Sequence, residues 1–319
     1  MLSKTVAAIQ GGQTFLVLAH EGPDGDALGS TLALVNALNE MGKEATAFNI
    51  DGVPDKFNFL PGSEGVVTSI ETGRIFDVVF VLDVGELRRA QLDVRPMCKT
   101  LINVDHHPFS EDFGDIYYVD TAASATAAIL YRVIKELNHP FSTDVATCIY
   151  TAILSDTGSF RYSSANGESF AIAGEMVDAG VDPWHVAGGL YESQEVERLQ
   201  LLGLALNTIQ VSPCGRCAAI YVSQQMLNQV GVGAEYADSF VNYPRSINGV
   251  EVALFFREIT SMSFKLGMRS KGTIDVGALA REFGGGGHHN AAGAELSGSI
   301  DDVMQGTFKR IDQLLLEMV

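Results

Sequence analysis

Short apolar runs alternate with segments of helical periodicity along the first half of the chain. The first run covers residues 14–19, and it is followed by a polar loop that contains glycine and by an apolar-periodic segment over 27–41. This succession is typical of a strand, a loop and a helix. Similar strand-like runs follow at 45–50, 78–82, 101–104 and 116–119, with helical patterns at 124–137 and 144–154. Because strands and helices alternate, the pattern predicts an α/β fold with a doubly wound parallel sheet.

The second half of the chain has a different pattern. Residues 183–206 are helical in their periodicity, and beyond them lie strand-like runs at 217–222, 250–258 and 261–268, a helix at 276–283 and a final helix at 301–318. A chain of 319 residues also exceeds the usual size of one domain. We therefore predict a first domain over 1–185, a helical linker over 186–206 and a smaller α/β domain with an antiparallel sheet over 207–319. The active site is expected in the cleft between the domains.

Composition and charge limit the partners of the protein. With 46% hydrophobic and 19% charged residues, the chain has enough apolar material for packed cores. Its 39 acidic residues outnumber 21 basic ones and give a net charge of −18, which argues against binding long duplex nucleic acid. The N-terminal apolar stretch is too short for a membrane span and lacks a signal-peptide core, so we expect no membrane partner and a cytoplasmic location.

Two of the four cysteines, Cys214 and Cys217, form a C-x-x-C pair. No second pair and no nearby histidine accompany them. We therefore interpret the pair as a turn between two strands rather than as a zinc or redox site.

Polar side chains follow three of the predicted strands at the point where each strand ends. His20, Asp83 and Asp105 come directly after apolar runs that lie far apart in the sequence. In parallel sheets covered by helices, reactive groups collect at the carboxyl ends of the strands. We therefore expect these three side chains to converge at one edge of the sheet.

The loop after the first strand reads HEGPDGD and holds His20, Asp24 and Asp26. Imidazole and carboxylate groups suit divalent ions such as Mn²⁺ or Mg²⁺, and the absence of a thiolate argues against structural zinc. For Asp26 alone the structural alternative is an N-cap, since it precedes a predicted helix. Grouped carboxylates repel one another unless a cation neutralises them, so the triplet as a whole favours a metal site.

Further candidate ligands follow later apolar segments. Asp83 ends the run VVFVLD, the triplet of Asp105, His106 and His107 ends LINVDHH, and Asp156 lies in AILSDTGSF. Two adjacent divalent ions need about as many ligands as this set offers: His20, Asp24, Asp26, Asp83, His106 and Asp156. Because two such ions can bind both sides of an in-line phosphoryl displacement, the pattern indicates a metal-dependent phosphoesterase.

These motifs resemble those of the DHH phosphoesterase superfamily. The HxxxDxD loop, the strand-end Asp83, the DHH triplet and the later SDTG occur in the order expected for that superfamily. The segment REFGGGGHHNAAG resembles the DHHA1 substrate-binding motif, so the resemblance covers nearly the whole chain. It implies a catalytic, metal-binding DHH domain followed by a DHHA1 domain that binds the substrate.

The resemblance also implies a role for each residue. His20, Asp24 and Asp83 would hold one ion, and Asp26, Asp83, His106 and Asp156 would hold the other, with Asp83 bridging two ions that are expected to be Mn²⁺, with Mg²⁺ as the alternative. The catalytic roles fall to Asp105, which would support the site, and to His107, which would donate a hydrogen bond to a substrate phosphate oxygen.

In the second domain, the resemblance places substrate contacts in the glycine motif and on a nearby strand. Gly284, Gly285, Gly286 and Gly287 would let backbone N–H groups approach a phosphate, next to His288; a flexible turn is the structural alternative. Arg269, in FKLGMRSKG, resembles the arginine of the DHHA1 strand and would grip a phosphate or stack on a base.

Within the superfamily, the chain is similar to the small oligoribonucleases called nano-RNases, some of which also remove the 3′-phosphate of adenosine 3′,5′-bisphosphate. The expected substrates are short single-stranded RNA, cleaved to 5′-mononucleotides, or small nucleotides. Two alternatives stay open: a phosphodiesterase for cyclic dinucleotides or their linear products, and a non-enzymatic nucleotide sensor. A homodimer is open as well.

Overall fold

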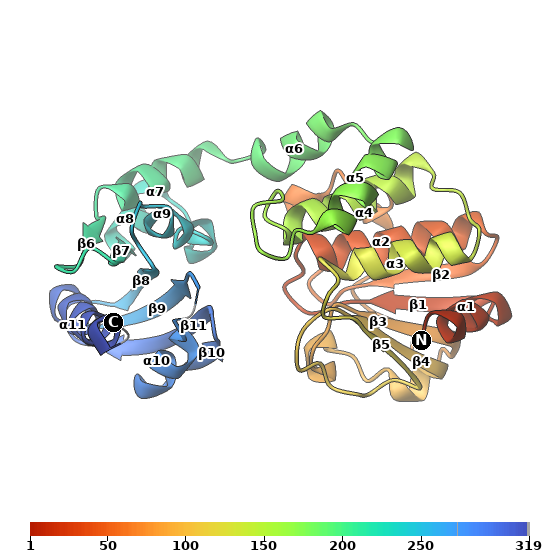
Figure 1. The fold of residues 1–319 in the computed structure, drawn as a ribbon, viewed down its shortest axis with the longest axis horizontal. Coiled ribbons are helices and arrows are strands. Elements are labelled where there is room, and N and C mark those ends of the chain that lie inside the picture. The colour runs from red at the N-terminus through yellow and green to blue at the C-terminus, as the bar shows by residue number, and fades with distance from the viewer. Residues whose placement is uncertain (273, 318–319) are drawn as a thin grey trace. The chain divides into compact units, whose positions relative to one another are not determined.

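The protein is represented by a computed structural model that describes residues 1–272 and 274–317. By its internal contacts the chain divides into two compact units, Met1–Ser193 and Gln194–Val319. Each unit has its own sheet and its own hydrophobic cores (Figure 1).

The first unit is built on a five-stranded sheet whose order is β2-β1-β3-β4-β5 and whose strand pairs are all parallel. Its strands are β1 (Thr14–Leu18), β2 (Glu44–Phe48), β3 (Phe76–Leu82), β4 (Cys98–Asp105) and β5 (Ile116–Val119). The parallel sheet predicted from the apolar runs is confirmed, and each predicted run overlaps a strand, although the runs at 14–19 and 45–50 extend one and two residues past the ends of β1 and β2.

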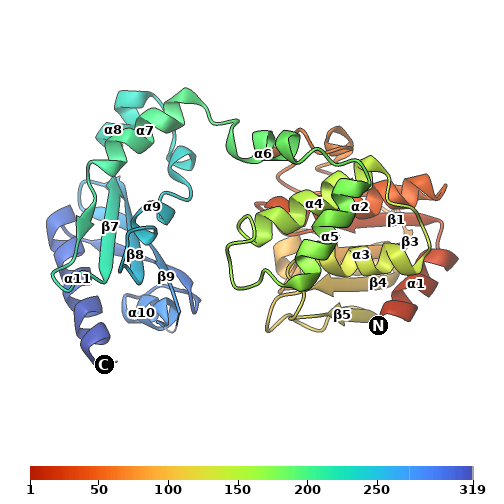
Figure 2. The same ribbon diagram turned by 45° about the horizontal axis from the view of Figure 1, so that its top comes forward.

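Helices cover one face of this sheet, some of them directly and others by packing on a helix that does (Figure 1). They are α1 (Leu2–Gly11), α2 (Gly25–Glu40), α3 (Thr126–Glu136), α4 (Thr143–Asp156), α5 (Gly167–Asp178) and α6 (Pro183–Tyr191). Helices α2, α3 and α4 lie over the same face in Figures 1 and 2. Helices α2 and α4 approach closely at Gly29, where an added Cβ would lie 2.6 Å from the carbonyl oxygen of Cys148. Only glycine permits this separation.

The opposite face of the sheet is also buried. Leu16, Val79 and Val81 point into a second core, where Val84 and Val94 from the irregular segments after β3 pack against them. Strands that are covered on both faces need apolar side chains at consecutive positions. This explains why β1 and β3 are continuous apolar runs rather than alternating ones.

The second unit contains a six-stranded sheet of order β10-β11-β9-β8-β7-β6. Its strands are β6 (Gln210–Val211), β7 (Cys217–Val222), β8 (Val252–Thr260), β9 (Ser263–Ser270), β10 (Gly286–His288) and β11 (Ala291–Ser297). Its helices are α7 (Val196–Leu206), α8 (Gln224–Val230), α9 (Asn242–Arg245), α10 (Val276–Glu282) and α11 (Ile300–Glu317).

Two expectations for this part of the chain are corrected. The sheet is antiparallel except for β7 and β8, which are parallel because α8 and α9 lie between them and supply the long crossover that parallel strands require. The helical stretch over 183–206 is two helices, α6 and α7, since the polar run of Glu192, Ser193, Gln194 and Glu195 interrupts the apolar pattern. Within the described residues, no helix combines the length and apolar character that a membrane span needs.

Candidate metal centre

The carboxyl ends of three neighbouring strands carry the first group of polar residues. His20 and Asp83 follow β1 and β3, and Asp105 ends β4, which lies beside β3 in the sheet. The Nε2 atom of His20 is 3.6 Å from Oδ2 of Asp83. The expected convergence at one edge of the sheet is therefore present in the structure.

Three overlapping groups of potential ligand atoms form at this edge, each with all its atoms within 4.8 Å of one another. The groups are His20, Asp24 and Asp83; Asp26, His106 and Asp156; and Asp83, His106 and His107. Nε2 of His106 lies 3.6 Å from Oδ1 of Asp83 and 3.5 Å from Oδ2 of Asp156. The structure thus brings all six predicted metal ligands into one cluster, with Asp83 common to two of the groups.

The buried carboxylates of this cluster repel one another, and bound cations would reduce that repulsion. Asp26 and Asp83 are only 1% and 2% exposed. Burial, together with the charges of Asp83 and Asp156, holds the pKa of Asp26 well above its usual range. Burial and the neighbouring carboxylates of Asp83 and Asp24 raise the pKa of Asp156 to about 7. Divalent cations bound by carboxylate oxygens and imidazole nitrogens would relieve this repulsion, so the donor set fits ions of the Mn²⁺ or Mg²⁺ class.

Helix α3 holds the carboxylate of Asp26. The backbone N–H groups of Thr126 and Ala127 donate to Oδ2 and Oδ1 of Asp26 over 2.6 and 3.1 Å, and the Ser30 hydroxyl donates to Oδ1 over 2.8 Å. The N-cap of α2 is not Asp26 but Asp24, whose Oδ1 accepts the N–H groups of Asp26 and Ala27. Asp26 instead satisfies the first N–H groups of a helix 100 residues away in the sequence.

Asp83 accepts a hydrogen bond from α3, as Asp26 does, and its backbone is in an uncommon conformation. The Thr126 hydroxyl donates to its Oδ1 over 3.0 Å. Its φ of 58° lies in the left-handed region, which an aspartate tolerates better than most residues. The chain therefore turns sharply at a residue that contributes to two of the three overlapping ligand groups.

The loop that carries His20 is held from the end of β2. Nδ1 of His20 is 2.8 Å from the Glu21 carbonyl oxygen, which leaves Nε2 on the side of Asp83. The buried Asn49 side chain donates to the His20 carbonyl oxygen over 2.9 Å. Groups that orient a ligand in this way tune a metal site from outside it. Neither Asn49 nor Thr126 was among the residues expected at the site.

Asp105 organises the two histidines that follow it. Its Oδ1 accepts the backbone N–H groups of His106 and His107 over 2.8 and 3.2 Å, and it lies 2.8 Å from Nδ1 of His107. The hydrogen bond with Asp105 outweighs the effect of burial and raises the pKa of His107 to about 9. Since Nδ1 of His107 is occupied, Nε2 is the ring nitrogen available to a ligand.

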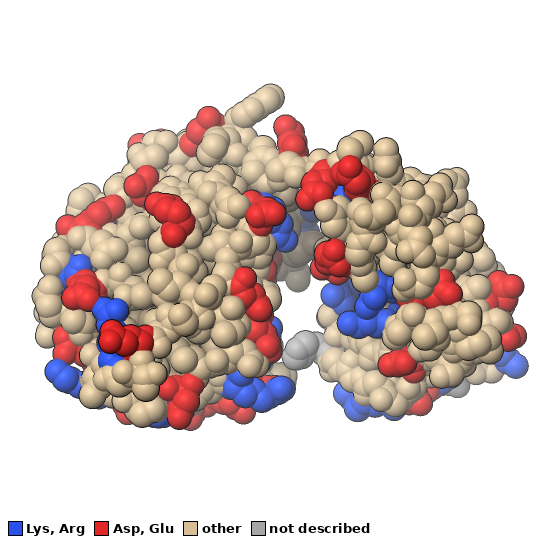
Figure 3. All heavy atoms as spheres, turned by 180° about the vertical axis from the view of Figure 1, so that it is seen from behind, with Lys and Arg blue, Asp and Glu red and all other residues tan. Residues whose placement is uncertain are grey.

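The second unit has a pocket of about 490 Å³, here called the cationic pocket, lined by residues of β8, β9 and β11 and by residues of the segment 234–242. Three cationic side chains, Arg257, Lys265 and Arg269, line it together with two acidic ones, Glu235 and Asp238, and Gly267 and Gly293 also belong to the lining. Figure 3 shows Lys and Arg side chains (blue) gathered on one part of the surface of this smaller unit. The predicted Arg269 thus lies in a pocket whose other two cations, Arg257 and Lys265, carried no motif in the sequence.

The glycine run leads into β10, the edge strand of this sheet, and is not among the described residues that line the pocket. A Cβ at Gly285 would lie 2.1 Å from the Gly293 carbonyl oxygen, and one at Gly287 would lie 2.5 Å from Cα of Ala292. Close packing of this segment on β11 therefore explains two of the four glycines, and the flexible-turn alternative does not hold for β10. His288 is in β10, and its side chain lies outside the described part of the structure.

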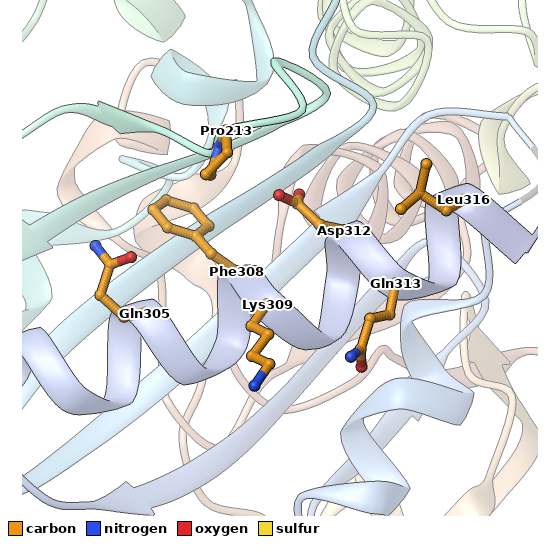
Figure 4. A pocket seen from close by; sticks show the side chains of 7 residues that line it. All are labelled: Pro213, Gln305, Phe308, Lys309, Asp312, Gln313 and Leu316. Atoms are coloured by element: carbon orange, nitrogen blue, oxygen red, sulfur yellow. The ribbon is translucent and has the colours of Figure 1, made fainter.

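A smaller hollow of about 250 Å³ lies along α11 and includes Pro213, Phe308 and Asp312 (Figure 4). The Asp312 carboxylate accepts hydrogen bonds from the Ser212 hydroxyl over 2.8 Å and from the Cys214 thiol over 2.9 Å. It thereby fixes the turn between β6 and β7, which confirms the interpretation of the cysteine pair as a turn. We assign no chemistry to this hollow.

Comparison with known proteins agrees with this geometry. Residues 14–153 match the N-terminal domain of the DHH family, and residues 219–317 match the DHHA1 domain. The bifunctional oligoribonuclease and PAP phosphatase NrnA of Thermus thermophilus is 31% identical over 299 residues, which cover 93% of this chain and 88% of that protein. The protein of the same name from Bacillus subtilis is 28% identical over 93% of each chain.

Among solved structures, an exopolyphosphatase-related protein from Bacteroides fragilis superimposes with a TM-score of 0.90 and 28% identity, over 98% of this chain and 97% of that one. One family accounts for the cluster of candidate metal ligands, for the two matching domains and for the relatives that match over most of the chain. The chain belongs to the DHH family of phosphoesterases.

Proposed function

We propose that this protein hydrolyses RNA oligonucleotides of two to five residues to 5′-mononucleotides, and that it also removes the 3′-phosphate of adenosine 3′,5′-bisphosphate. The observation that carries the proposal is the convergence of His20, Asp24, Asp26, Asp83, His106 and Asp156 at one sheet edge, with Asp83 common to two ligand groups. Two relatives named oligoribonuclease and PAP phosphatase support the choice of substrate.

Different residues would bind the metal ions and the substrate phosphate in such a reaction. The six carboxylate and imidazole ligands would hold two divalent ions, with Mn²⁺ as the expected metal. When bound, such ions neutralise charge on a phosphoryl group and make a water molecule more acidic. His107 would donate a hydrogen bond from Nε2 to a phosphate oxygen, and this bond strengthens as negative charge builds in the transition state. Asp105 keeps that imidazole in place through Nδ1.

In the second unit, the cationic pocket is the proposed site for the rest of the substrate. Arg269, Arg257 and Lys265 offer positive charge to a phosphate or a stacking surface to a base. Contacts from Gly284, Gly285, Gly286, Gly287 and His288 to a phosphate stay predictions, as do a homodimer and a cytoplasmic location.

The test is a substrate panel with Mn²⁺ added to the purified protein. The panel holds RNA of two, five and twenty-four residues, adenosine 3′,5′-bisphosphate, a cyclic dinucleotide and pyrophosphate. We expect turnover of the dimer, the pentamer and the bisphosphate. Equal rates on the dimer and the long strand would reject the length preference, and turnover of the cyclic dinucleotide alone would replace the proposed substrate.

The matched variants are Asp83→Asn and Asp178→Asn. Asp83 is shared by two ligand groups, whereas Asp178 is an exposed residue at the end of α5. Because loss of a shared ligand weakens the binding of both ions, we expect Asp83→Asn to lose most turnover and Asp178→Asn to lose none. Near-normal turnover by Asp83→Asn would contradict the assignment of the site.

A further inference from the structure

Phe109 is placed in an unfavourable way, two residues after His107. Its side chain is 100% exposed, and its φ of 69° lies in the left-handed region. An exposed phenyl ring forgoes the stabilisation that burial would bring. The left-handed backbone is also costly for a residue with a bulky side chain. Both costs fall on the same residue, and strained residues of this kind cluster at functional sites.

The loop around Phe109 is braced on both sides. Before it, His107 is tied to Asp105 through Nδ1. After it, the Ser110 carbonyl oxygen accepts the Tyr117 hydroxyl over 2.7 Å, and the fully buried Asn103 donates to Ser110 Oγ over 3.3 Å. The Phe109 ring is therefore displayed on a fixed turn rather than on a loose loop.

This turn is part of the rim of the metal centre. Nδ1 of His107 is 3.5 Å from Oδ1 of Asp83. Phe109 follows His107 by two residues, and two residues of chain span at most about 7 Å, so the Cα atom of Phe109 lies within that distance of the Cα atom of His107. The Glu111 N–H donates to the Gly85 carbonyl oxygen over 2.8 Å, which ties the turn to the segment that follows Asp83. That segment also reaches the His20 loop, since the Arg89 carbonyl oxygen accepts the Glu21 N–H over 2.8 Å.

We propose that Phe109 stacks on a base of the substrate, at the nucleotide next to the phosphate that is cleaved. This inference rests on the proposed function and adds a specificity residue to it. A nucleotide presents a flat ring close to a charged phosphate, and an exposed phenyl ring two residues after His107 of the metal centre matches both parts. Stacking on an aromatic side chain tolerates every base, because each base has a π-face. Phe109 therefore selects nucleotides over phosphates that carry no base, without reading sequence.

The experiment measures kcat/KM on the diadenylate pApA and on two analogues that each lack one of the two bases. The variants are Phe109→Ala, Phe109→Trp and, as a matched control, Ile75→Ala, which removes a 60% exposed side chain just before β3, away from its carboxyl end. We expect Phe109→Ala to lose at least about fivefold in kcat/KM on pApA, mainly through KM. Phe109→Trp, which keeps an aromatic ring, and Ile75→Ala should both have the kcat/KM of the wild type on pApA.

The analogues identify the base. On the analogue that lacks the contacted base, wild type and Phe109→Ala should have equal kcat/KM, whereas the other analogue should keep the difference. A difference that persists on both analogues would overturn the proposal, because the ring would then contact no base. Equal kcat/KM on pApA would also overturn it while leaving the proposed function intact. If the wild type cleaves no oligonucleotide, the proposed function itself fails.

Two further measurements separate stacking from other roles. Glycine fits the left-handed backbone best, so Phe109→Gly should keep the melting temperature of the wild type while losing the same activity on pApA. A large fall in its melting temperature with equal losses on all three substrates would assign Phe109 a structural role instead. A change of oligomeric state in Phe109→Ala by sedimentation velocity, with kcat/KM unchanged, would assign the ring to a protein interface; both results contradict the proposal.

Discussion

Single residues outside the ligand set hold the metal-type cluster in place. Thr126 contributes twice, since its N–H donates to Asp26 and its hydroxyl donates to Asp83. The two carboxylates come from α2 and from the end of β3, so one threonine couples two separate elements. Uncharged groups of this kind orient ligands without binding the ion themselves.

Removal of the Thr126 hydroxyl is expected to weaken metal binding. Thr126→Val keeps the shape of the side chain and removes the donor to Asp83, so we expect the affinity for Mn²⁺ to fall by about tenfold or more in calorimetric titration. Thr126→Ser should keep the affinity of the wild type. Thr151→Val is the control, because the buried hydroxyl of Thr151 has no hydrogen-bond partner among the described residues. Equal affinities for Thr126→Val and Thr151→Val would show that the hydroxyl does not support the site.

The sequence predicted the charged residues of the cluster better than the neutral ones. His20, Asp83 and Asp105 could be found because each ends an apolar run, and parallel strands bring such ends together. Thr126 lies 43 residues from Asp83 and 100 residues from Asp26, and its part in the site depends on how α3 packs. Short-range patterns carry no information about a contact of that kind.

At the scale of elements, one carboxylate joins three strands at the other edge of the same sheet. Asp77, in β3, accepts the N–H groups of Gln13 and Thr14 over 2.8 and 3.0 Å, at the start of β1. Lys99 of β4 donates to the same carboxylate over 2.8 Å. The hydrogen bond with Lys99 and those with the two N–H groups hold the pKa of Asp77 well below its usual range.

The stability of the first unit should therefore depend on Asp77 in a pH-dependent way. Because the pKa of Asp77 is lowered in the folded state, its contribution is present above the ordinary value of about 3.9 and is lost as the pH falls through the folded value. We expect Asp77→Asn to lower the free energy of unfolding by about 1 kcal/mol at pH 7 in urea titration. The gap to the wild type should narrow as the pH falls from about 4 toward 2. A gap that stays constant with pH would show that the charge of Asp77 is not the cause.

The elements found from the sequence are those with at least four residues in a clear apolar pattern. Strands β5 and β7 have the bounds that the apolar runs at 116–119 and 217–222 predicted. Strands β6 and β10 have two and three residues, too few to show any periodicity. Helix α5 begins with Gly167 and carries a second glycine, Gly174, so its helical propensity is weak. The parallel pairing of β7 and β8 depends on the path of the chain between them, which local patterns do not specify.

At the scale of the whole molecule, the two units have separate hydrophobic cores, and all six candidate metal ligands belong to the first unit. Binding of an ion should therefore stabilise one unit and leave the other unchanged. An ion at a hundredfold excess over its Kd adds about 2.7 kcal/mol, which raises the melting temperature of a unit of this size by about 5–10 °C.

Differential scanning calorimetry of the full chain should test this. We expect two unfolding transitions. Mn²⁺ should raise the melting temperature of one of them, and EDTA should reverse that rise. The shift should be absent in Asp83→Asn and present in Asp178→Asn. Equal shifts of both transitions with Mn²⁺ would mean that the ion acts outside the cluster or that the two units unfold together.

The close contact between α2 and α4 at Gly29 bears on catalysis as well as on packing. Helix α2 carries Asp26 in its first turn, one turn before Gly29, and α4 ends at Asp156, one turn after Ala152. A methyl group at position 29 would lie 2.8 Å from the Ala152 side chain and would force the two helix axes apart. The distance between Asp26 and Asp156 therefore depends on the absence of a side chain at position 29. A substitution at position 29 is therefore expected to disturb the site even though Gly29 is not one of the candidate ligands.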